Sequence, residues 1–153
     1  MIELVEALNY RCLHYVRQRL SPFQVLIGPN ASGKTTFLDT VAFLGDLVRD
    51  GLSASISERT RTFEDLIWQR QGSSFELALE ARIPEDRKQK LQQKSDSVRY
   101  EVKIGTNSRT GEVSILAEKV LLKRDEDEDA SPERELFPIE PAPPSTIVSS
   151  KGL

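Results

Sequence analysis

Apolar and polar residues alternate at period two in three stretches of the second half of the chain. Residues 75–83 and 98–104 alternate cleanly, and residues 112–122 form a third candidate. Such alternation predicts strands with one buried and one solvated face, which is typical of an antiparallel sheet. At the N-terminus, residues 2–8 roughly alternate as well, and we expect residues 16–20 to return beside them as a second strand.

Residues 23–50 contain a short apolar run followed by apolar residues at helical spacing. Residues 23–27, Phe-Gln-Val-Leu-Ile, follow Pro22 and end at Gly28, which predicts a short strand buried on both faces. Beyond residues 28–33, apolar residues recur at helical spacing and predict an amphipathic helix of about four turns that stops at Gly51. The expected apolar stripe of this helix consists of Phe37, Val41, Leu44 and Val48.

The segments between these elements carry weaker signals. Residues 52–61 predict a loop, whereas residues 62–68 predict a short helix that begins at Thr62. The charged residues 85–94 predict a further helix. Together the patterns predict an α/β fold, with a mixed or antiparallel sheet around the helix that follows residue 33.

Composition limits the classes of protein that fit. The 153 residues suit one domain, and the 38% of hydrophobic residues can supply a core. No apolar run approaches the ~18 residues of a membrane span, and Glu3, Glu6 and Arg11 stand where a signal peptide needs an apolar core. A single cysteine, Cys12, excludes an intramolecular disulfide framework and a multi-cysteine metal site. We therefore expect a soluble, cytoplasmic protein.

The composition of the chain changes near residue 124, where an acidic, proline-rich segment begins. Residues 124–153 hold eight acidic and three basic residues, with five consecutive acids at 125–129, and five of the eight prolines. A segment of this composition buries too little apolar surface to offset its ordering entropy. The sequence therefore predicts a folded lobe over residues 1–123 and a mobile, acidic, proline-rich tail or linker over residues 124–153.

Residues 28–35 match the phosphate-binding loop (Walker A) pattern G-x-x-x-x-G-K-[ST] at every defined position. Glycines permit close backbone approach to an anion, and amides at the start of the following helix point at it. Lys34 suits the β- and γ-phosphates, and the Thr35 hydroxyl suits Mg²⁺. The predicted strand and helix on either side are the context that such a loop needs. Candidate nucleotide-binding residues are Gly28, Pro29, Asn30, Ala31, Ser32, Gly33, Lys34 and Thr35, with Thr35 as the candidate metal ligand.

The loop and its surroundings resemble the nucleotide site of ABC-type ATPase heads, notably the RecF/SMC/OLD branch, whose domains are often called AAA-type. The shared features are Asn30, the Thr35 and Thr36 pair after the lysine, and the opening Asn-Tyr-Arg at residues 9–11. The resemblance covers about residues 1–122. It implies a P-loop NTPase fold, ATP and Mg²⁺ as cofactors, and Lys34 as a catalytic residue. It also places Thr36 at the α-phosphate and Arg11 close to nucleotide or DNA.

The resemblance further implies partners and an incomplete ATPase. Such heads typically pair around ATP and act on DNA or in defence against foreign DNA. They also need an acidic strand end, a signature loop and a switch histidine, whereas here the only histidine, His14, precedes the loop. The chain thus resembles the N-terminal lobe of a head, able to hydrolyse ATP only with a completing lobe from a downstream segment or a separate chain.

Two other functions stay open. A truncated or regulatory nucleotide-binding subunit without catalysis would account for the incomplete site. A small P-loop kinase or GTPase would need further parallel strands, and the sequence lacks an Asn-Lys-x-Asp guanine motif. Among weaker features, Phe63 and Trp68 suit either adenine stacking or core packing.

Overall fold

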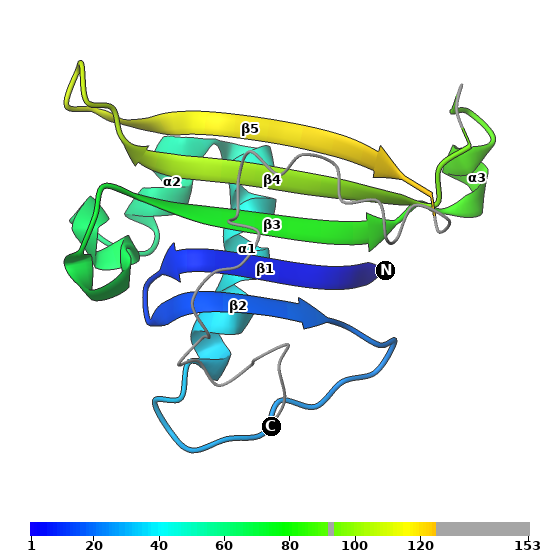
Figure 1. Ribbon diagram of the computed structural model, residues 1–153, viewed down its shortest axis with the longest axis horizontal. Coiled ribbons are helices and arrows are strands. Elements are labelled where there is room, and N and C mark those ends of the chain that lie inside the picture. Colours follow the sequence, from blue (N-terminus) through cyan, green and yellow to red (C-terminus); the bar gives the residue numbers. More distant parts are fainter. Residues whose placement is uncertain (92–93, 125–153) are drawn as a thin grey trace.

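The computed structural model describes residues 1–91 and 94–124, which form a five-stranded sheet with helices on one face (Figure 1). The sheet has the order β2-β1-β3-β4-β5, and every neighbouring pair is antiparallel. All five strands expected at these places form, with ends that differ by a few residues from the predicted ones. Their bounds are β1 (Ile2–Tyr10), β2 (Leu13–Arg19), β3 (Ser74–Arg82), β4 (Ser97–Thr106) and β5 (Val113–Lys123).

The long helix predicted after the candidate loop is confirmed as α1 (Lys34–Asp50). It ends at Gly51, whose φ of 84° favours glycine. The prediction of a loop over residues 52–61 is wrong, because α2 (Leu52–Ser57) starts directly after Gly51. The helix predicted over residues 62–68 is two short 3₁₀ turns, and the one predicted over residues 85–94 is a single turn. These elements are η1 (Phe63–Leu66), η2 (Trp68–Arg70) and α3 (Glu85–Lys88).

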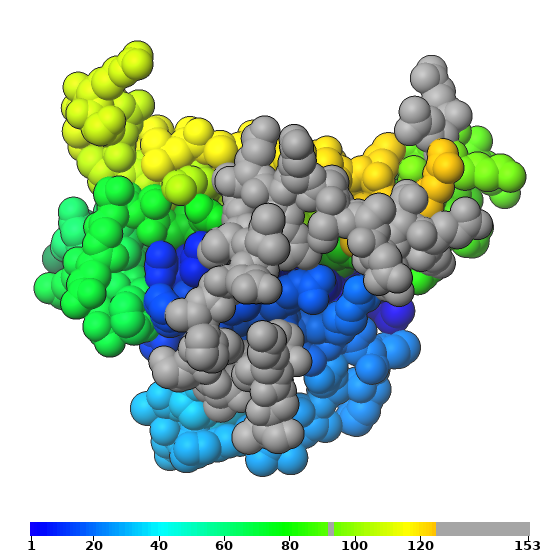
Figure 2. Space-filling view, viewed as in Figure 1, coloured from blue at the N-terminus to red at the C-terminus, as the bar shows by residue number. Residues whose placement is uncertain are grey.

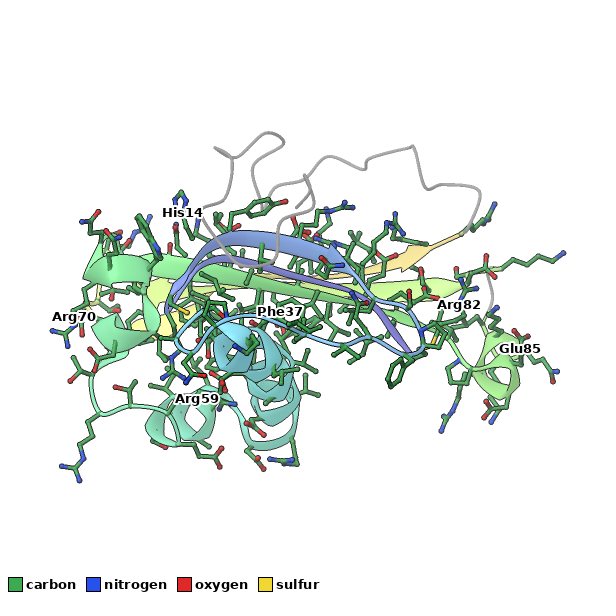
Figure 3. The ribbon with its side chains drawn as sticks, turned by 90° about the horizontal axis from the view of Figure 1, so that it is seen from below. His14, Phe37, Arg59, Arg70, Arg82 and Glu85 are labelled. Atoms are coloured by element: carbon green, nitrogen blue, oxygen red, sulfur yellow. The ribbon has the colours of Figure 1, made fainter. Side chains whose placement is uncertain are left out.

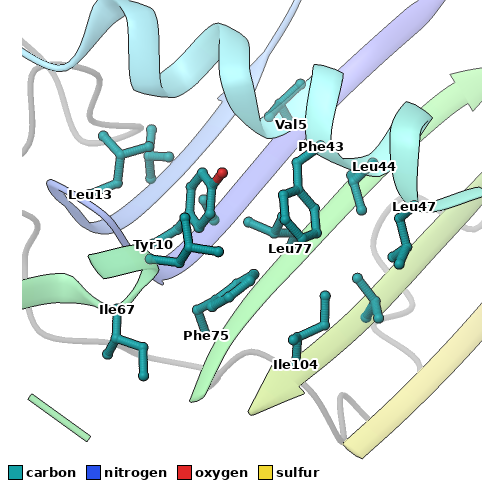
Figure 4. Close-up of a cluster of buried hydrophobic side chains, with 14 of the residues drawn as sticks. Val5, Tyr10, Leu13, Phe43, Leu44, Leu47, Ile67, Phe75, Leu77 and Ile104 are labelled. Carbon is teal, nitrogen blue, oxygen red and sulfur yellow. The ribbon is translucent and has the colours of Figure 1, made fainter. Parts of the chain in front are cut away.

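Helix α1 crosses the back of the sheet and encloses the apolar core with it (Figure 1, Figure 4). An aromatic cluster joins helix to sheet: the Tyr10 ring lies 5.9 Å from that of Phe43 and 5.0 Å from that of Phe75. The predicted stripe is only partly correct, since Val48 is 74% exposed. The helix has apolar residues on more than one side, and the sheet takes the side that carries both phenylalanines. The buried residues of α1 are Phe37, Thr40, Phe43, Leu44 and Leu47.

The buried strand predicted over residues 23–27 does not form. Phe23 is 84% exposed and Ile27 is 86% exposed, and in the described part of the chain no strand pairs with this segment. A strand buried on both faces needs neighbouring strands and an apolar layer above and below. Here β1 already pairs with β2 and β3, and the segment pairs with neither edge strand, so Phe23 and Ile27 have no neighbouring strand to pack beside. The sheet is consequently antiparallel rather than mixed, and residues 20–33 run along the lower border of the molecule (Figure 1, Figure 2).

The face of the sheet opposite α1 carries a buried ionic network, and His14 lies on that same side (Figure 3). Arg99 on β4 donates hydrogen bonds to Glu101 and, at 2.7 Å, to Glu6 on β1. The Tyr15 hydroxyl on β2 donates to the other Glu6 oxygen at 2.8 Å. The network links β1, β2 and β4 across the strands, so we expect it to fix the sheet register.

The predictions of an acidic tail and of no membrane-spanning segment remain to be compared with the structure. Residues 125–153 lie outside the described residues, so the acidic tail stays a prediction. Within residues 1–91 and 94–124, none of the helices has the length and apolar character needed to span a bilayer.

Candidate functional site

The candidate phosphate-binding loop turns sharply into α1. Gly33 has φ 88° and ψ 5°, a left-handed conformation that glycine adopts without a steric penalty. Ala31 also has a positive φ of 62°, which is uncommon for a residue with a side chain. Helix α1 begins at the next residue after Gly33, Lys34, as the Walker A pattern requires.

The Lys34 side chain folds back over the loop that precedes it. Its ammonium group donates hydrogen bonds to the carbonyl oxygens of Gly28 at 2.8 Å and Pro29 at 2.6 Å, and to the Ser32 hydroxyl at 3.1 Å. Three loop residues therefore hold the positive charge beside the N-terminus of α1. This is the place where a phosphate group would meet both the ammonium and the helix amides.

The first turn of α1 offers donors to an anion. Its N-cap is Gly33, and among the described residues no side chain caps the helix. The turn contains no acidic residue, so the partial positive charge of the helix N-terminus is not offset there. Thr35 is exposed on this turn, and the Thr36 hydroxyl accepts a hydrogen bond from the Cys12 thiol at 3.2 Å. The structure thus brings the turn between β1 and β2 against the first turn of α1.

A magnesium ion would find one protein oxygen here, the hydroxyl of Thr35. Mg²⁺ usually keeps several waters and takes its remaining ligands from one or two protein oxygens and substrate phosphates. In residues 1–91 and 94–124, no group of three or more His, Cys, Asp or Glu side chains is arranged to hold a metal ion. The donor set therefore fits a cation that arrives with a nucleotide.

Arg11 reaches the same region through an ion pair with α1. Its guanidinium donates to an Asp39 carboxylate oxygen at 3.0 Å, and the Tyr10 hydroxyl donates to that oxygen at 2.6 Å. Burial, and then the hydrogen bond to Asp39, raise the pKa of Tyr10 well above its usual value. Arg59 donates to the second Asp39 oxygen at 2.8 Å and to Asp46 at 2.8 Å. The hydrogen bond from Arg59 lowers the pKa of Asp46.

An open pocket of about 410 Å³ lies beside Thr36. Its wall is formed by Arg11, Cys12, Thr36, Asp65, Ile67, Gln69 and Arg70. Three of the five non-glycine residues with positive φ in the described chain lie in this wall: Arg11, Gln69 and Arg70. Backbone strain of this kind is often found at ligand sites, where the surrounding structure holds it in place.

The sequence analysis missed the acidic anchor of Arg11. Asp39 follows Thr36 by three residues, which places it one helical turn along α1, and Asp46 follows two turns later on the same side. This spacing was the available signal, but the partner Arg59 comes from beyond α2 and is brought close only by the fold. Of the two aromatic candidates, Phe63 is buried in the core, and the Trp68 ring stacks on His14 at 4.3 Å.

Comparison with known protein families gives a match over most of this chain. A family model described as "AAA domain, putative AbiEii toxin, Type IV TA system" matches residues 23–150. The matched region begins at Phe23, in the exposed segment, and includes the whole candidate loop and α1. The comparison with curated proteins finds no match to this chain.

Proposed function

The chain belongs to this family of AAA domains, and from that premise we propose that it binds ATP with Mg²⁺ on the loop formed by residues 28–35. Membership in an AAA family indicates nucleotide binding and an ATPase-like function in general terms. The assignment to these residues is supported by the Walker A pattern and by the local geometry.

The observation that carries the proposal is the position of Lys34. The loop holds its ammonium group at the N-terminus of α1, where the helix amides and the positive charge favour the same anion. In the proposed complex Lys34 contacts the β- and γ-phosphates and Thr35 binds Mg²⁺, which neutralises the phosphate charge. The other proposed nucleotide contacts are Gly28, Pro29, Asn30, Ala31, Ser32, Gly33, Thr36 and Arg11.

The pocket beside Thr36 could hold the rest of the nucleotide. It adjoins the first turn of α1, and its wall carries donors from Arg11, Gln69 and Arg70. We assign the nucleoside to this pocket, with Thr36 near the α-phosphate and the β- and γ-phosphates on the loop.

We further propose that the chain is the N-terminal lobe of a RecF/SMC/OLD-like ATPase head. The support is an apolar surface that the described chain leaves uncovered. Phe23, Val25 and Ile27 are exposed, as are Leu38 and Val48 on the side of α1 away from the sheet. An added Cβ at Gly45, on the same side, would meet no atom within 4 Å. Exposed apolar side chains on both segments favour a further apolar layer, which a completing lobe would supply.

The cellular role follows as a proposal from the same resemblance. RecF/SMC/OLD-like heads pair with a second head and act on DNA or in defence. The family description names a putative toxin of a type IV toxin–antitoxin system, which favours the defence role.

The test is a calorimetric titration of Mg·ATP into the full 153-residue chain. Lys34→Ala is expected to weaken binding roughly 30-fold or more, equivalent to about 2 kcal/mol, because it removes the charge that faces the phosphates. The matched control is Lys90→Ala, an exposed lysine beyond α3, which should bind as the unsubstituted chain does. Full affinity in Lys34→Ala, with an unchanged unfolding midpoint, would contradict the proposal.

The rate of ATP hydrolysis distinguishes an incomplete lobe from a complete ATPase. A helix N-terminus and a lysine stabilise phosphate charge but do not activate a water molecule, so phosphate release by the isolated chain should stay at background. Sustained release that Lys34→Ala abolishes would show that no completing lobe is needed.

A further inference from the structure

Asp39 joins two distant segments of the chain to α1 at the candidate nucleotide site. Its carboxylate accepts hydrogen bonds from Tyr10 at 2.6 Å, Arg11 at 3.0 Å and Arg59 at 2.8 Å. Tyr10 ends β1, Arg11 lies in the turn before β2, and Arg59 follows α2. Asp39 itself lies one turn beyond Thr36 on α1. A single side chain therefore ties the β1–β2 turn to the helix that starts at the phosphate loop.

Arg59 holds this carboxylate in place. Its side chain is only 9% exposed and donates further to Asp46 at 2.8 Å and to the Ser55 carbonyl at 2.9 Å. Its guanidinium also lies 5.0 Å from the centre of the Phe43 ring, in cation–π geometry. The acceptors raise the pKa of Arg59 against the effect of burial, so this charge is permanent. Because these contacts fix Arg59, Asp39 presents its second oxygen to Arg11 in a defined position.

Arg11 is the member of the cluster that a ligand can reach. Its side chain is 39% exposed and lines the pocket beside Thr36. Its backbone is fixed in the left-handed region at φ 52°, and its amide donates to the Leu66 carbonyl at 2.9 Å. A guanidinium has five N–H donors in a planar fork. The bond to Asp39 uses one of them, so the group can bind Asp39 and a phosphate oxygen together.

We propose that Asp39 is a positioning residue for nucleotide binding, which acts by holding the Arg11 guanidinium toward the phosphate chain. The proposal rests on the function proposed above. An unrestrained arginine side chain loses rotamer freedom when it binds a phosphate, whereas one already held by a carboxylate loses less. The two aspartates of the cluster, Asp39 and Asp46, are balanced by Arg11 and Arg59. Arg49 also pairs with Asp46, so the negative charge of Asp39 is offset within the cluster.

The test is the affinity of the full chain for Mg·ATP in a double-mutant cycle. Asp39→Asn should weaken binding about three- to tenfold, the ratio expected when one long side chain must be ordered on binding. Asp50→Asn is the matched control, because Asp50 also lies on α1 and pairs with an arginine, Arg49, away from the site. It should change the affinity less than twofold. In an Arg11→Ala background, Asp39→Asn should have no further effect.

The double-mutant cycle distinguishes positioning of Arg11 from a merely structural role of Asp39, because only positioning makes the effect of Asp39→Asn depend on Arg11. Loss of affinity through general destabilisation would persist when Arg11 is absent, and such persistence would overturn the proposal. Unchanged affinity in Asp39→Asn would overturn it as well. Asparagine keeps the shape of the side chain and one acceptor oxygen. If Asp39→Asn does not fold, Asp39→Glu is the second variant: it keeps the charge but moves the carboxylate, and its loss of affinity should again depend on Arg11.

The two proposals fail in different ways. If the unsubstituted chain binds Mg·ATP and Lys34→Ala does not, the proposed function stands, and the cycle alone decides the role of Asp39. If the unsubstituted chain does not bind Mg·ATP, or Lys34→Ala binds equally well, the proposed function fails and the role of Asp39 falls with it.

Discussion

Two segments of this chain have apolar patterns typical of strands, but only one of them forms a strand. Residues 75–83 become β3, which pairs with β1 on one side and β4 on the other. Residues 23–27 are more apolar, yet they lie outside the sheet with Phe23 and Ile27 exposed. The difference is the presence of neighbours. A pattern of apolar residues indicates what a segment is able to bury, whereas the rest of the fold decides whether partners are available.

The same contrast runs through α1. The side that carries Phe37, Phe43 and Leu47 is packed against the sheet, while Leu38 and Val48 on the outer side are exposed. We call the apolar core between α1 and the sheet the complete region, and the outer side of α1 together with Phe23, Val25 and Ile27 the uncovered region. Truncating an apolar side chain in the complete region should therefore destabilise the fold, and truncating one in the uncovered region should not.

The largest expected effect is at the centre of the complete region. Phe75→Ala should lower the free energy of unfolding by about 3–5 kcal/mol, because it removes a buried ring from the aromatic cluster. Urea denaturation of both proteins, followed by circular dichroism, measures the difference. A loss below about 1 kcal/mol would mean that the core between α1 and the sheet is not well packed.

Two glycines make a matched pair of smaller effects. A Cβ at Gly105 would lie 2.5 Å from the Ser73 carbonyl oxygen and 2.6 Å from the Ser74 Cβ. Gly105→Ala should therefore destabilise the fold by roughly 1–3 kcal/mol through overpacking. At Gly45, in the helix, a Cβ meets no atom within 4 Å, so Gly45→Ala should stabilise it by about 0.5–1 kcal/mol. Equal effects at the two sites, measured by thermal unfolding, would contradict the contrast.

Tyr10 should make the folded state less stable at alkaline pH. Its pKa is raised in the folded state by burial and by the hydrogen bond to Asp39. Its contribution to stability is therefore full below the unfolded pKa of about 10 and is lost as pH rises above it, by at most ~1.4 kcal/mol per pH unit. Tyr10→Phe should flatten this part of the profile between pH 9 and roughly pH 11. Superimposable slopes for the two proteins would show that Tyr10 ionises equally in both states.

The smallest expected effect is in the uncovered region. Phe23→Ser and Ile27→Ser should each change the free energy of unfolding by no more than about 0.5 kcal/mol, because both side chains are exposed. Urea denaturation checks this directly. A loss of about 2 kcal/mol would mean that the segment is packed in solution.

The strands, the long helix and the candidate loop were predictable because their signals are local. Alternation at β3 and β4, Gly51 at the helix end and the spacing of Gly28, Gly33 and Lys34 each lie within a few residues. What the sequence could not provide depends on distant partners. The buried side of α1 was only partly predicted, with Val48 wrongly included, because the sheet and solvent sides both carry apolar residues. The Asp39–Arg59 contact joins residues 20 apart through the turn into α2.

The central claim is that residues 28–36 form the nucleotide site while the antiparallel sheet is a fixed support. Hydrogen–deuterium exchange of the full chain, with and without Mg·ATP, tests it most directly. We predict slower exchange at the amides of residues 28 and 30–36 when Mg·ATP is added, no change in β3 and β4, and no slowing in Lys34→Ala. Unchanged exchange at residues 28–36 at saturating Mg·ATP, or equal slowing in Lys34→Ala, would contradict the claim.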